Sequence, residues 1–399
     1  MKYDVMHTRL TLTPGPQLSA MHVQRLQRSL LRWFSASKRD LPWRKTRDPY
    51  AIWISEVMLQ QTQVATVIPY YNNFLTHFPD IRSLARADTA DVLALWAGLG
   101  YYRRAHQLHA AAQIVLNNHG GMLPTEFDHL LSLPGLGPYT AGAVASIAFG
   151  RRVPAVDGNV LRVMTRLLAD GRDIHQPTVQ RDLRRTAETW VPPRRAGDFN
   201  QALMELGATI CTARSPLCPR CPLRAICSAR RSGDPTQYPV STPAIDRRNL
   251  YMAAIAITSD NNELFMAQRR SPGLWAGLWE LPAVTISGPK APRIAELIRL
   301  ARDKLGIQLA EANRVTDIRH TLTHRQITVW IYRGRAAAAG RKRGRPTPAA
   351  TPTDYAAIRR ATRPDELPLS VLAEKQLSAL RLAEADIPAA GCAGGTNER

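Results

Sequence analysis

The sequence of 399 residues has no apolar run of about eighteen residues, the length that a membrane-spanning helix needs. Its start, MKYDVMHTRLTLTPGPQ, lacks the apolar segment of a secretory signal. Cysteine is scarce, and 4 of the 5 cysteines fall within residues 211–227. We therefore expect a cytoplasmic protein. In that reducing compartment, four clustered cysteines indicate a metal site and not disulfides.

Acidic residues are also few, with 32 Asp and Glu against 53 Lys and Arg, which gives a formal net charge of +21. Such an excess of positive charge directs a protein toward polyanions, of which nucleic acid is the commonest. Binding to a membrane surface is the alternative, but it would require a basic amphipathic helix, and none stands out. The composition therefore favours a nucleic-acid partner and no membrane.

The chain divides into a helical part and a mixed part. Segments such as MHVQRLQRSLLRWF and NVLRVMTRLLAD carry apolar residues at helical spacing. Later segments such as NLYMAAIAIT and QITVWIYRGR read as strands, and PRIAELIRLARDKLG reads as a helix. The predicted organisation is a flexible extension at 1–17, a helical domain at 18–229, a Pro-containing linker at 230–247, a smaller α+β domain at 248–384 with a flexible basic insert at 336–353, and a flexible tail at 385–399.

The stretch LPGLGPYTAGAVASIA, residues 133–148, places two glycines between two helical segments. Gly135, Leu136 and Gly137 predict a tight hairpin with exposed backbone amides. Those amides, with the start of the next helix, can hold a phosphate oxygen. The alternative is an ordinary helix–turn–helix loop, and the positive charge of the chain favours the phosphate grip.

Two carboxylates stand at positions that suit chemistry. Asp157 in VDGNV precedes a helical run by one residue and is typical of an N-cap, a role that also holds a carboxylate ionised and aimed. Glu56 in IWISEVMLQQTQV lies among apolar residues. It is either an exposed glutamate of an amphipathic helix or faces inward, where burial would raise its pKa and make it a proton donor near neutrality.

These motifs together resemble a known superfamily. The helices, the glycine hairpin, the aspartate 18 residues after Tyr139 and the four cysteines are similar to the helix–hairpin–helix DNA glycosylases. SEVMLQQTQV, LPGLGPYTAGA and VDGNV resemble the MutY-type adenine DNA glycosylases over about residues 20–230, and the resemblance resumes in the C-terminal domain. It implies a mostly α fold, in which a two-lobed glycosylase domain with an iron–sulfur loop is linked to a smaller α+β, Nudix-like domain.

The resemblance implies that the four cysteines hold one 4Fe-4S cluster. The ligands would be Cys211, Cys218, Cys221 and Cys227. Zinc is the chemical alternative, because four thiolates suit it too, although zinc modules usually offer two close cysteine pairs and this segment has one. The cluster would pin the loop so that Arg220 and its neighbours face DNA phosphate; otherwise these arginines only solvate the loop.

The resemblance also assigns catalytic roles. A base inside a duplex must be flipped out before it can be removed. Glu56 would protonate adenine at N7 and Asp157 would stabilise the oxocarbenium ion, a division of labour similar to that of glycosidases. Tyr139 and Asn159 would touch the sugar, unless they are a packed aromatic and a polar residue at a helix start. Endonuclease III-type enzymes carry a lysine nucleophile where Tyr139 stands, so strong strand-cleaving lyase activity is not expected.

Further positions match residues that contact DNA in the family. Gln61 and Tyr101 resemble wedges into the base stack, and Trp43 and Arg44 in LPWR resemble residues near the adenine pocket. For Tyr101 and Trp43 the alternative is plain core packing.

The C-terminal domain resembles a Nudix fold in GLWAGLWELP, but Leu300 and Lys304 stand where a working Nudix hydrolase needs acidic metal ligands. The resemblance instead implies recognition of 8-oxoguanine by Leu322, Thr323 and His324, where the family has an F-S-H type loop. The insert GRKRGRP is either similar to an AT-hook, which lays arginines in the minor groove, or is a solvated basic linker.

We therefore predict a monomeric, monofunctional glycosylase that removes adenine opposite 8-oxoguanine or guanine in double-stranded DNA. We expect it in the bacterial cytoplasm, associated with the nucleoid. The alternatives are a glycosylase with another base preference, a DNA-binding regulator with a metal module, and a Nudix-type hydrolase. The presence of both Glu56 and Asp157 argues against the regulator, and Leu300 and Lys304 argue against the hydrolase.

Overall fold

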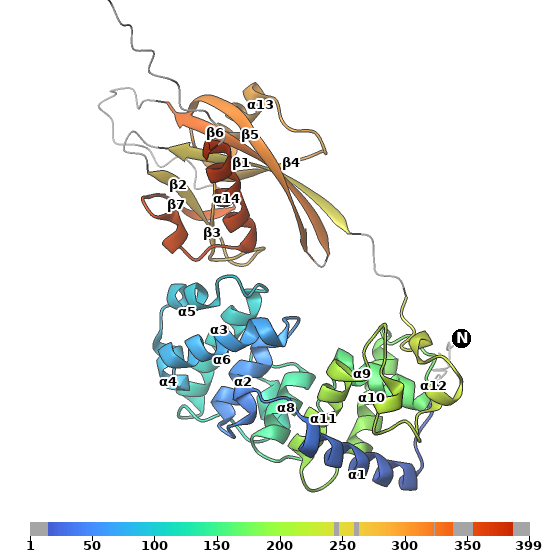
Figure 1. Cartoon of the computed structure of the whole chain (residues 1–399). Helices are drawn as coiled ribbons and strands as arrows, with labels where there is room; N and C mark the ends of the chain where they lie inside the picture. The colour runs from blue at the N-terminus through green and yellow to red at the C-terminus, as the bar shows by residue number, and fades with distance from the viewer. Residues whose placement is uncertain (1–14, 243–246, 259–262, 323, 338–353, 386–399) are drawn as a thin grey trace, which may run out of the picture. The chain divides into compact units, whose positions relative to one another are not determined.

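The computed structural model describes residues 15–242, 247–258, 263–322, 324–337 and 354–385 (Figure 1). The chain forms two compact units: Met1–Arg86 with Gln107–Pro243, and Ala87–His106 with Ala244–Arg399. The first is helical and the second joins a sheet to helices, so the predicted fold class is confirmed. The domain boundaries stay predictions, and the GRKRGRP insert lies outside the described residues.

Helices make up the regular structure that is described in the first unit. Its α-helices are α1 (Ala20–Ser37), α2 (Pro49–Met58), α3 (Val64–His77), α4 (Ile81–Arg86), α7 (Phe127–Leu131), α8 (Pro138–Ile147), α9 (Gly158–Leu168), α10 (Pro177–Trp190), α11 (Ala196–Thr209) and α12 (Ser228–Arg231). Short 3-10 turns are η1 (Pro42–Arg44), η2 (Cys218–Arg220) and η3 (Pro235–Gln237). Helix α5 (Thr89–Trp96) belongs to the second unit, and α6 (Arg103–Asn118) runs from that segment back into the first.

Local signals explain where the functional helices begin. Helix α2 starts at Pro49, which suits the first helical position, and the side chain of Asp48 accepts hydrogen bonds from the amides of Tyr50 and Ala51. Helix α8 likewise starts with Pro138 directly after Gly137. These signals fix the starting residues of the two helices.

Two groups of helices pack together within the first unit. Helices α2 and α8 contact each other, and α3 and α7 pack beside them. A separate apolar core joins α1, α9, α10 and α11, and it includes Leu223 and Ile226 from the cysteine loop. Helix α11 contacts both α8 and α9, so it links the two groups. The cysteine loop is thus anchored by its own apolar side chains.

The second unit contains a seven-stranded sheet in the order β3-β2-β1-β6-β5, with β4 paired to β1 and β7 paired to β2. Its strands are β1 (Arg248–Thr258), β2 (Leu264–Arg269), β3 (Trp279–Glu280), β4 (Ala283–Ile286), β5 (Leu309–Leu322), β6 (Arg325–Ala336) and β7 (Tyr355–Ala361). Only β1 and β6 pair in parallel among these strands. Helices α13 (Ile294–Leu300) and α14 (Val371–Ala385) pack against β5, a π-helical turn (Ala301–Leu305) follows α13, and η5 (Pro364–Glu366) precedes α14.

No helix in the described ranges is both long and apolar enough to cross a bilayer.

Candidate active site

A cavity of about 530 Å³ joins three sequence motifs of the first unit. Its walls are Leu59–Gln63 at the end of α2, Tyr139 in the first turn of α8, and Asp157–Asn159 at the start of α9. These motifs are far apart in the sequence, and the packing of α2 against α8 and of α8 against α11 brings them together. Asp157 thus lines the cavity directly, and Glu56 lies behind Tyr139, which donates a hydrogen bond to it.

Glu56 faces inward. Its exposed fraction is 5%, and every residue of α2 from Tyr50 to Met58 is buried. The hydroxyl of Tyr139 donates a hydrogen bond to Glu56 Oε2 at 2.5 Å. Burial raises the pKa of Glu56 to about 7; the charge on Asp157 adds to this rise, whereas the hydrogen bond from Tyr139 and the charge on Arg44 oppose it. Glu56 can therefore carry a proton at neutral pH.

Asp157 is both a helix cap and a wall of the cavity. Its Oδ1 accepts a hydrogen bond from the amide of Val160 at 2.7 Å, and its Oδ2 accepts one from Asn159 Nδ2 at 2.8 Å. Burial raises the pKa of Asp157, and the two hydrogen bonds and the charge on Arg162 act in the opposite direction. The carboxylate is thus fixed in orientation and lies near enough to Glu56 to influence it electrostatically.

Arg162 connects this carboxylate to the cysteine loop. Its Nη2 donates to Asn159 Oδ1 and to the carbonyl of Gly207, and its Nε donates to the carbonyl of Cys211, each at 2.8 Å. A side chain at Gly207 would place its Cβ 2.7 Å from Asn159 Cβ, so the close approach of α11 to α9 needs glycine there. One guanidinium therefore supports both Asn159 and the first cysteine.

The four cysteines share one neighbourhood. Burial raises the pKa of the Cys221 thiol to about 12, and the charges of the other three cysteines act in the same direction. Arg166 is buried and donates to Cys211 Sγ at 3.3 Å, to the carbonyls of Thr212 and Ala213 at 2.7 and 2.8 Å, and to Tyr238 O at 3.0 Å. A cationic donor at the sulfur suits an anionic thiolate cluster.

The chemistry of the four cysteines suits an iron–sulfur cluster. Cys211, Cys218, Cys221 and Cys227 are free cysteines, so none of them is joined in a disulfide. Cysteine thiolates are the usual ligands of such clusters, although four thiolates also suit zinc. The residues present therefore fit an iron–sulfur cluster.

A buried ion pair lies beside Glu56. Glu205 on α11 is 1% exposed and accepts hydrogen bonds from Arg39 at 2.7–2.8 Å and from Arg44 at 2.8 Å. The guanidinium hydrogen bonds lower the pKa of Glu205 to about 2, against the effect of burial. Trp43 is buried and its ring meets Tyr71 edge-on at 5.4 Å. Arg44 is thus tied to Glu205, while its charge also acts on Glu56.

The hairpin between α7 and α8 differs in detail from the expected amide grip. Gly135 has a φ of +80°, and a Cβ there would lie 2.8 Å from the Cβ of Gln107. Leu136 is buried and its amide donates to the carbonyl of Leu133 at 3.2 Å. Gly137 is exposed at the N-cap of α8. Within the part of the chain that the structure describes, the amides of Gly135 and Gly137 are thus open to a phosphate, and that of Leu136 is not.

Two other DNA-facing candidates of the first unit are exposed. Gln61 lines the cavity and adopts the left-handed region with a φ of +59°, which is uncommon for a residue with a side chain. Arg220 is exposed in η2, between two of the cysteines. Both side chains are available to a ligand.

The remaining candidates belong to the second unit. Tyr101 is 47% exposed with a φ of +51°, and it precedes α6. Leu322 ends β5 and His324 is exposed in the hairpin before β6, whereas Thr323 lies outside the described residues. Lys304 is exposed in the π-helical turn, at a position that would need a carboxylate for Nudix hydrolysis.

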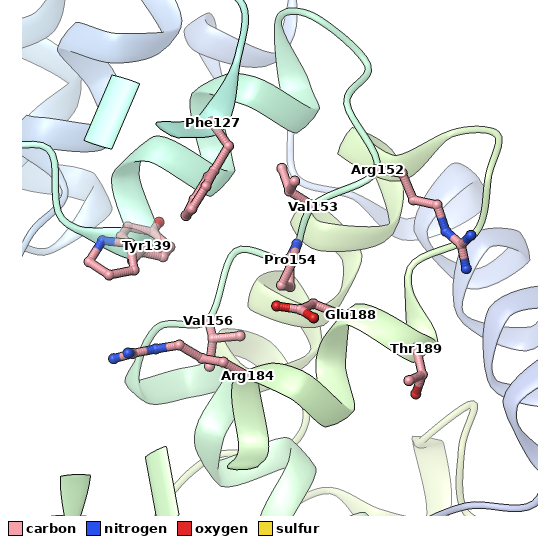
Figure 2. Close-up of a pocket in the computed structure, with 10 residues that line it drawn as sticks. Phe127, Tyr139, Arg152, Val153, Pro154, Val156, Arg184, Glu188 and Thr189 are labelled. Carbon is pink, nitrogen blue, oxygen red and sulfur yellow. The ribbon is translucent and has the colours of Figure 1, made fainter. Parts of the chain in front are cut away.

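A second cavity of about 430 Å³ shares Tyr139 with the first. Phe127 and Tyr139 of the hairpin helices, the loop from Arg152 to Val156, and Arg184 and Glu188 of α10 form its walls (Figure 2). Arg152 is held there by a 2.9 Å hydrogen bond to the carbonyl of Val191. The ring of Tyr139 therefore separates two spaces, and its hydroxyl is directed to Glu56.

Three site residues were missed in the sequence: Arg162, Arg166 and Glu205. The first two are spaced four residues apart in NVLRVMTRLLAD, on one face of an amphipathic helix, and this spacing shows only that they point the same way. Glu205 lies in ALMELGA, another apolar helix. A charged residue within such a face indicates a buried partner, although the sequence does not identify it.

Comparisons with known proteins agree with this geometry. Residues 54–189 match the model of the HhH-GPD superfamily of base excision DNA repair proteins, residues 211–227 match the iron–sulfur binding domain of endonuclease III, and residues 253–379 match the NUDIX domain. The solved structure of a thermostable thymine-DNA glycosylase is 31% identical and covers 53% of this chain and 98% of its own, with a TM-score of 0.48. The three family matches alone define the class as a helix–hairpin–helix DNA repair glycosylase with an iron–sulfur domain and a Nudix-like domain.

Relatives with a curated function narrow the class. The human adenine DNA glycosylase is 37% identical over 76% of this chain and 66% of its own length. The rat adenine DNA glycosylase is 36% identical over 78% of this chain and 70% of its own, and that of Buchnera aphidicola subsp. Baizongia pistaciae is 32% identical over 76% and 83%. The chain belongs to the adenine DNA glycosylase family.

Proposed function

We propose that this glycosylase flips out and hydrolytically removes adenine mispaired with 8-oxoguanine or guanine, and leaves the DNA strand uncut. The observation that carries this proposal is the Tyr139–Glu56 hydrogen bond of 2.5 Å beside the capped carboxylate of Asp157. N-glycosidic cleavage needs a proton donor at the leaving base and a negative charge near the sugar. Glu56 would supply the proton and Asp157 the negative charge, because only Asp157 accepts hydrogen bonds from a helix amide and from Asn159.

Glu56 is the proton donor in this mechanism. Its pKa of about 7 leaves a substantial protonated fraction at neutral pH, and that proton is delivered to N7 of the extruded adenine. Protonation makes the base a better leaving group. Asp157 stays oriented by Val160 and Asn159, and its charge stabilises the oxocarbenium ion as the bond breaks. Water then completes hydrolysis at the sugar.

The absence of an amine from the described catalytic cavity supports monofunctional chemistry. The cavity walls carry amide, hydroxyl and carboxylate groups, and Tyr139 stands where the endonuclease III-type enzymes place a lysine. A Schiff base requires a primary amine at the sugar carbon. We therefore infer that strand cleavage depends on later chemistry outside this site.

The cysteine loop would hold one 4Fe-4S cluster, which would give the loop a fixed shape. Arg166 holds the loop carbonyls and Arg220 extends from η2, so the loop can present positive charge to a DNA backbone. The Nudix-like domain would read 8-oxoguanine through the hairpin at Leu322 and His324. We further propose that the protein acts as a monomer in the bacterial cytoplasm, at the nucleoid.

The test is a single-turnover reaction with purified protein in excess over duplex. Adenine opposite 8-oxoguanine, guanine or thymine is compared, and the strand is analysed with and without alkali. We expect breaks only after alkali, with the fastest reaction opposite 8-oxoguanine and none opposite thymine. Breaks without alkali would refute monofunctional chemistry, and no loss of adenine from any duplex would refute the proposed function. Equal rates for all three would refute the mispair preference.

A further inference from the structure

Helix α1 carries a row of unneutralised arginines on its exposed face. Arg25, Arg28 and Arg32 are exposed, and in the described part of the chain none of the three forms an ion pair or hydrogen bond. The sequence from Val5 to Arg39 contains no Asp or Glu at all. The opposite face of α1 is buried through Leu26, Leu30 and Phe34, so it is not available to a membrane.

The row leads into a second positively charged feature, which we call the basic pocket. Arg195 Nη2 donates to the hydroxyl of Ser35 at 3.0 Å, and Ser35 lies one turn beyond Arg32 on α1. The basic pocket has a volume of about 400 Å³. Its charged lining consists of Lys38, Arg44, Lys45, Arg47, Arg195 and one acid, Asp198.

Ion pairs leave part of this charge unbalanced. Arg44 is paired with Glu205, Lys45 with Asp40, and Arg195 with Asp198. Lys38 and Arg47 have no acidic partner among the residues that the structure describes. The start of α11, from Ala196 to Asp198, also lines the pocket and adds the positive end of a helix. The pocket is therefore suited to an anion.

The basic pocket and the catalytic cavity lie at opposite ends of the same two helices. Arg47 precedes α2 and Ile147 ends α8, whereas Gln61 follows α2 and Tyr139 opens α8. Both helices have ten residues, which corresponds to about 15 Å. The basic pocket and the catalytic cavity are therefore separate spaces, about one helix length apart.

We propose that Arg25, Arg28, Arg32, Lys38, Arg47 and Arg195, together the basic track, bind the backbone of a second nucleic-acid segment while the catalytic cavity holds its own duplex. The inference rests on the proposed function in one respect, that the first duplex occupies the hairpin side. A second site would keep the enzyme on DNA during transfer from one segment to another. It is independent of base recognition, because guanidinium and ammonium groups contact phosphates.

The chemistry of the track favours nucleic acid over an acidic protein. The three arginines of α1 are spaced three and four residues apart, which corresponds to about 4.5 and 6 Å along the helix. A duplex strand presents a phosphate about every 3.4 Å of its axis, so each guanidinium can meet a different phosphate. Protein interfaces depend on apolar or aromatic anchors, and Met21 is the one large apolar side chain on α1 that is markedly exposed.

The test measures a ternary complex with two duplexes. The full-length protein is saturated with a labelled duplex that carries 2′-fluoro-adenosine opposite 8-oxoguanine, which resists cleavage. A second, undamaged duplex with another label is then titrated, and the two labels are followed in one sedimenting species. The variants are R25Q/R28Q/R32Q for the row and K38Q/R47Q for the pocket. The control R293Q/R299Q/R302Q removes the same charge from exposed positions at α13.

We expect the wild type and the control to form the ternary complex. R25Q/R28Q/R32Q should bind the second duplex at least tenfold more weakly, and its log–log salt slope should fall by about 3, or roughly 0.9 per lost phosphate contact. K38Q/R47Q should lose binding in the same direction. Single-turnover excision from a cleavable duplex should stay at the wild-type rate in all of them, because none of these residues lines the catalytic cavity.

Several results would overturn the inference. One is the absence of a ternary complex with wild-type protein, and another is an equal loss in the row variant and the α13 control. A third is that labelled poly-glutamate binds the wild type as tightly as the second duplex and that the same variants lose this binding. That result would assign the basic track to an acidic protein. Failed excision with an intact ternary complex would refute the proposed function alone, so the two failures are distinguishable.

Discussion

Arg162 and Asn159 form a hydrogen bond of 2.8 Å that ties the catalytic carboxylate to the cysteine loop. Asn159 holds Asp157 on one side, and Arg162 holds the carbonyl of Cys211 on the other. The orientation of Asp157 therefore depends on a residue that also supports the loop of the cluster. A change in the position of the Cys211 carbonyl can therefore shift Asp157 through Arg162 and Asn159.

Replacing Arg162 should therefore slow excision and weaken the cluster together. In R162Q we expect at least a tenfold lower single-turnover rate, because a shorter neutral amide cannot span Asn159, Gly207 and Cys211, and hydrogen bonds to charged groups contribute about 1.5–3 kcal/mol each. R162K keeps the charge but not the fork of donors, and should also be slow. Iron content and rate are measured on the same samples. An exposed control, R181Q on α10, should match wild type, and a normal rate in R162Q would contradict the link.

The pKa of Glu56 predicts the pH dependence of excision. Because burial raises that pKa to about 7, the protonated form is the active acid below this value and is lost as pH rises through it. The single-turnover rate should be level below about pH 6 for as long as Asp157 stays ionised, and should fall about tenfold per pH unit above pH 8. E56Q should bind mispaired DNA but excise about 10²–10⁴-fold more slowly, since an amide cannot transfer a proton. A rate that rises through pH 7 would exclude Glu56 as the acid.

Tyr139 should determine the midpoint pH at which the excision rate falls. Its hydrogen bond to Glu56 Oε2 favours the carboxylate and so lowers the pKa of Glu56. In Y139F this bond is lost while the ring stays in place, so the midpoint of the pH–rate profile should move to higher pH. Y238F is a matched control in the same unit. A midpoint that stays fixed or moves down in Y139F would show that the hydroxyl does not govern this proton.

The fold class and the motifs could be read from the sequence, but the connections between motifs could not. Helical spacing identified the α-helices of the first unit because most have one apolar face. The spacing could not decide the direction of Glu56, because α2 is buried on all sides and has no polar face for comparison. Arg162 and Glu205 were missed for a related reason: the carbonyl of Cys211 lies 49 residues from Arg162, and the arginine partners of Glu205 lie 161–166 residues from it, beyond any local pattern.

Arg166 should be needed for the cluster loop and not for the fold of α9. It is fully enclosed and donates to the carbonyls of Thr212 and Ala213 and to Cys211 Sγ. R166M keeps the apolar stem but removes the donor from Cys211 Sγ and from two loop carbonyls, and these hydrogen bonds to a charged group contribute about 1.5–3 kcal/mol each. We expect less iron and acid-labile sulfide per chain than in R224M, which alters an exposed arginine of the same loop. Equal iron in the two variants would refute this role.

Glu205 should be a main determinant of stability, because it neutralises two arginines beside the active site. Removing one partner of a buried ion pair typically costs about 3–5 kcal/mol, which in a unit of this size lowers Tm by roughly 6–20 °C. We expect this loss in E205Q by calorimetry. D40N breaks the ion pair of Asp40 with Lys45, whose side chains are 78% and 65% exposed respectively, and should change Tm little.

The contribution of Glu205 to stability should also depend on pH. The pKa of Glu205 is lowered from 4.5 to about 2, so its contribution is present above pH 4.5 and disappears as pH falls toward 2. The difference in Tm between wild type and E205Q should therefore shrink over that interval, and a difference that grows on acidification would refute the pairing.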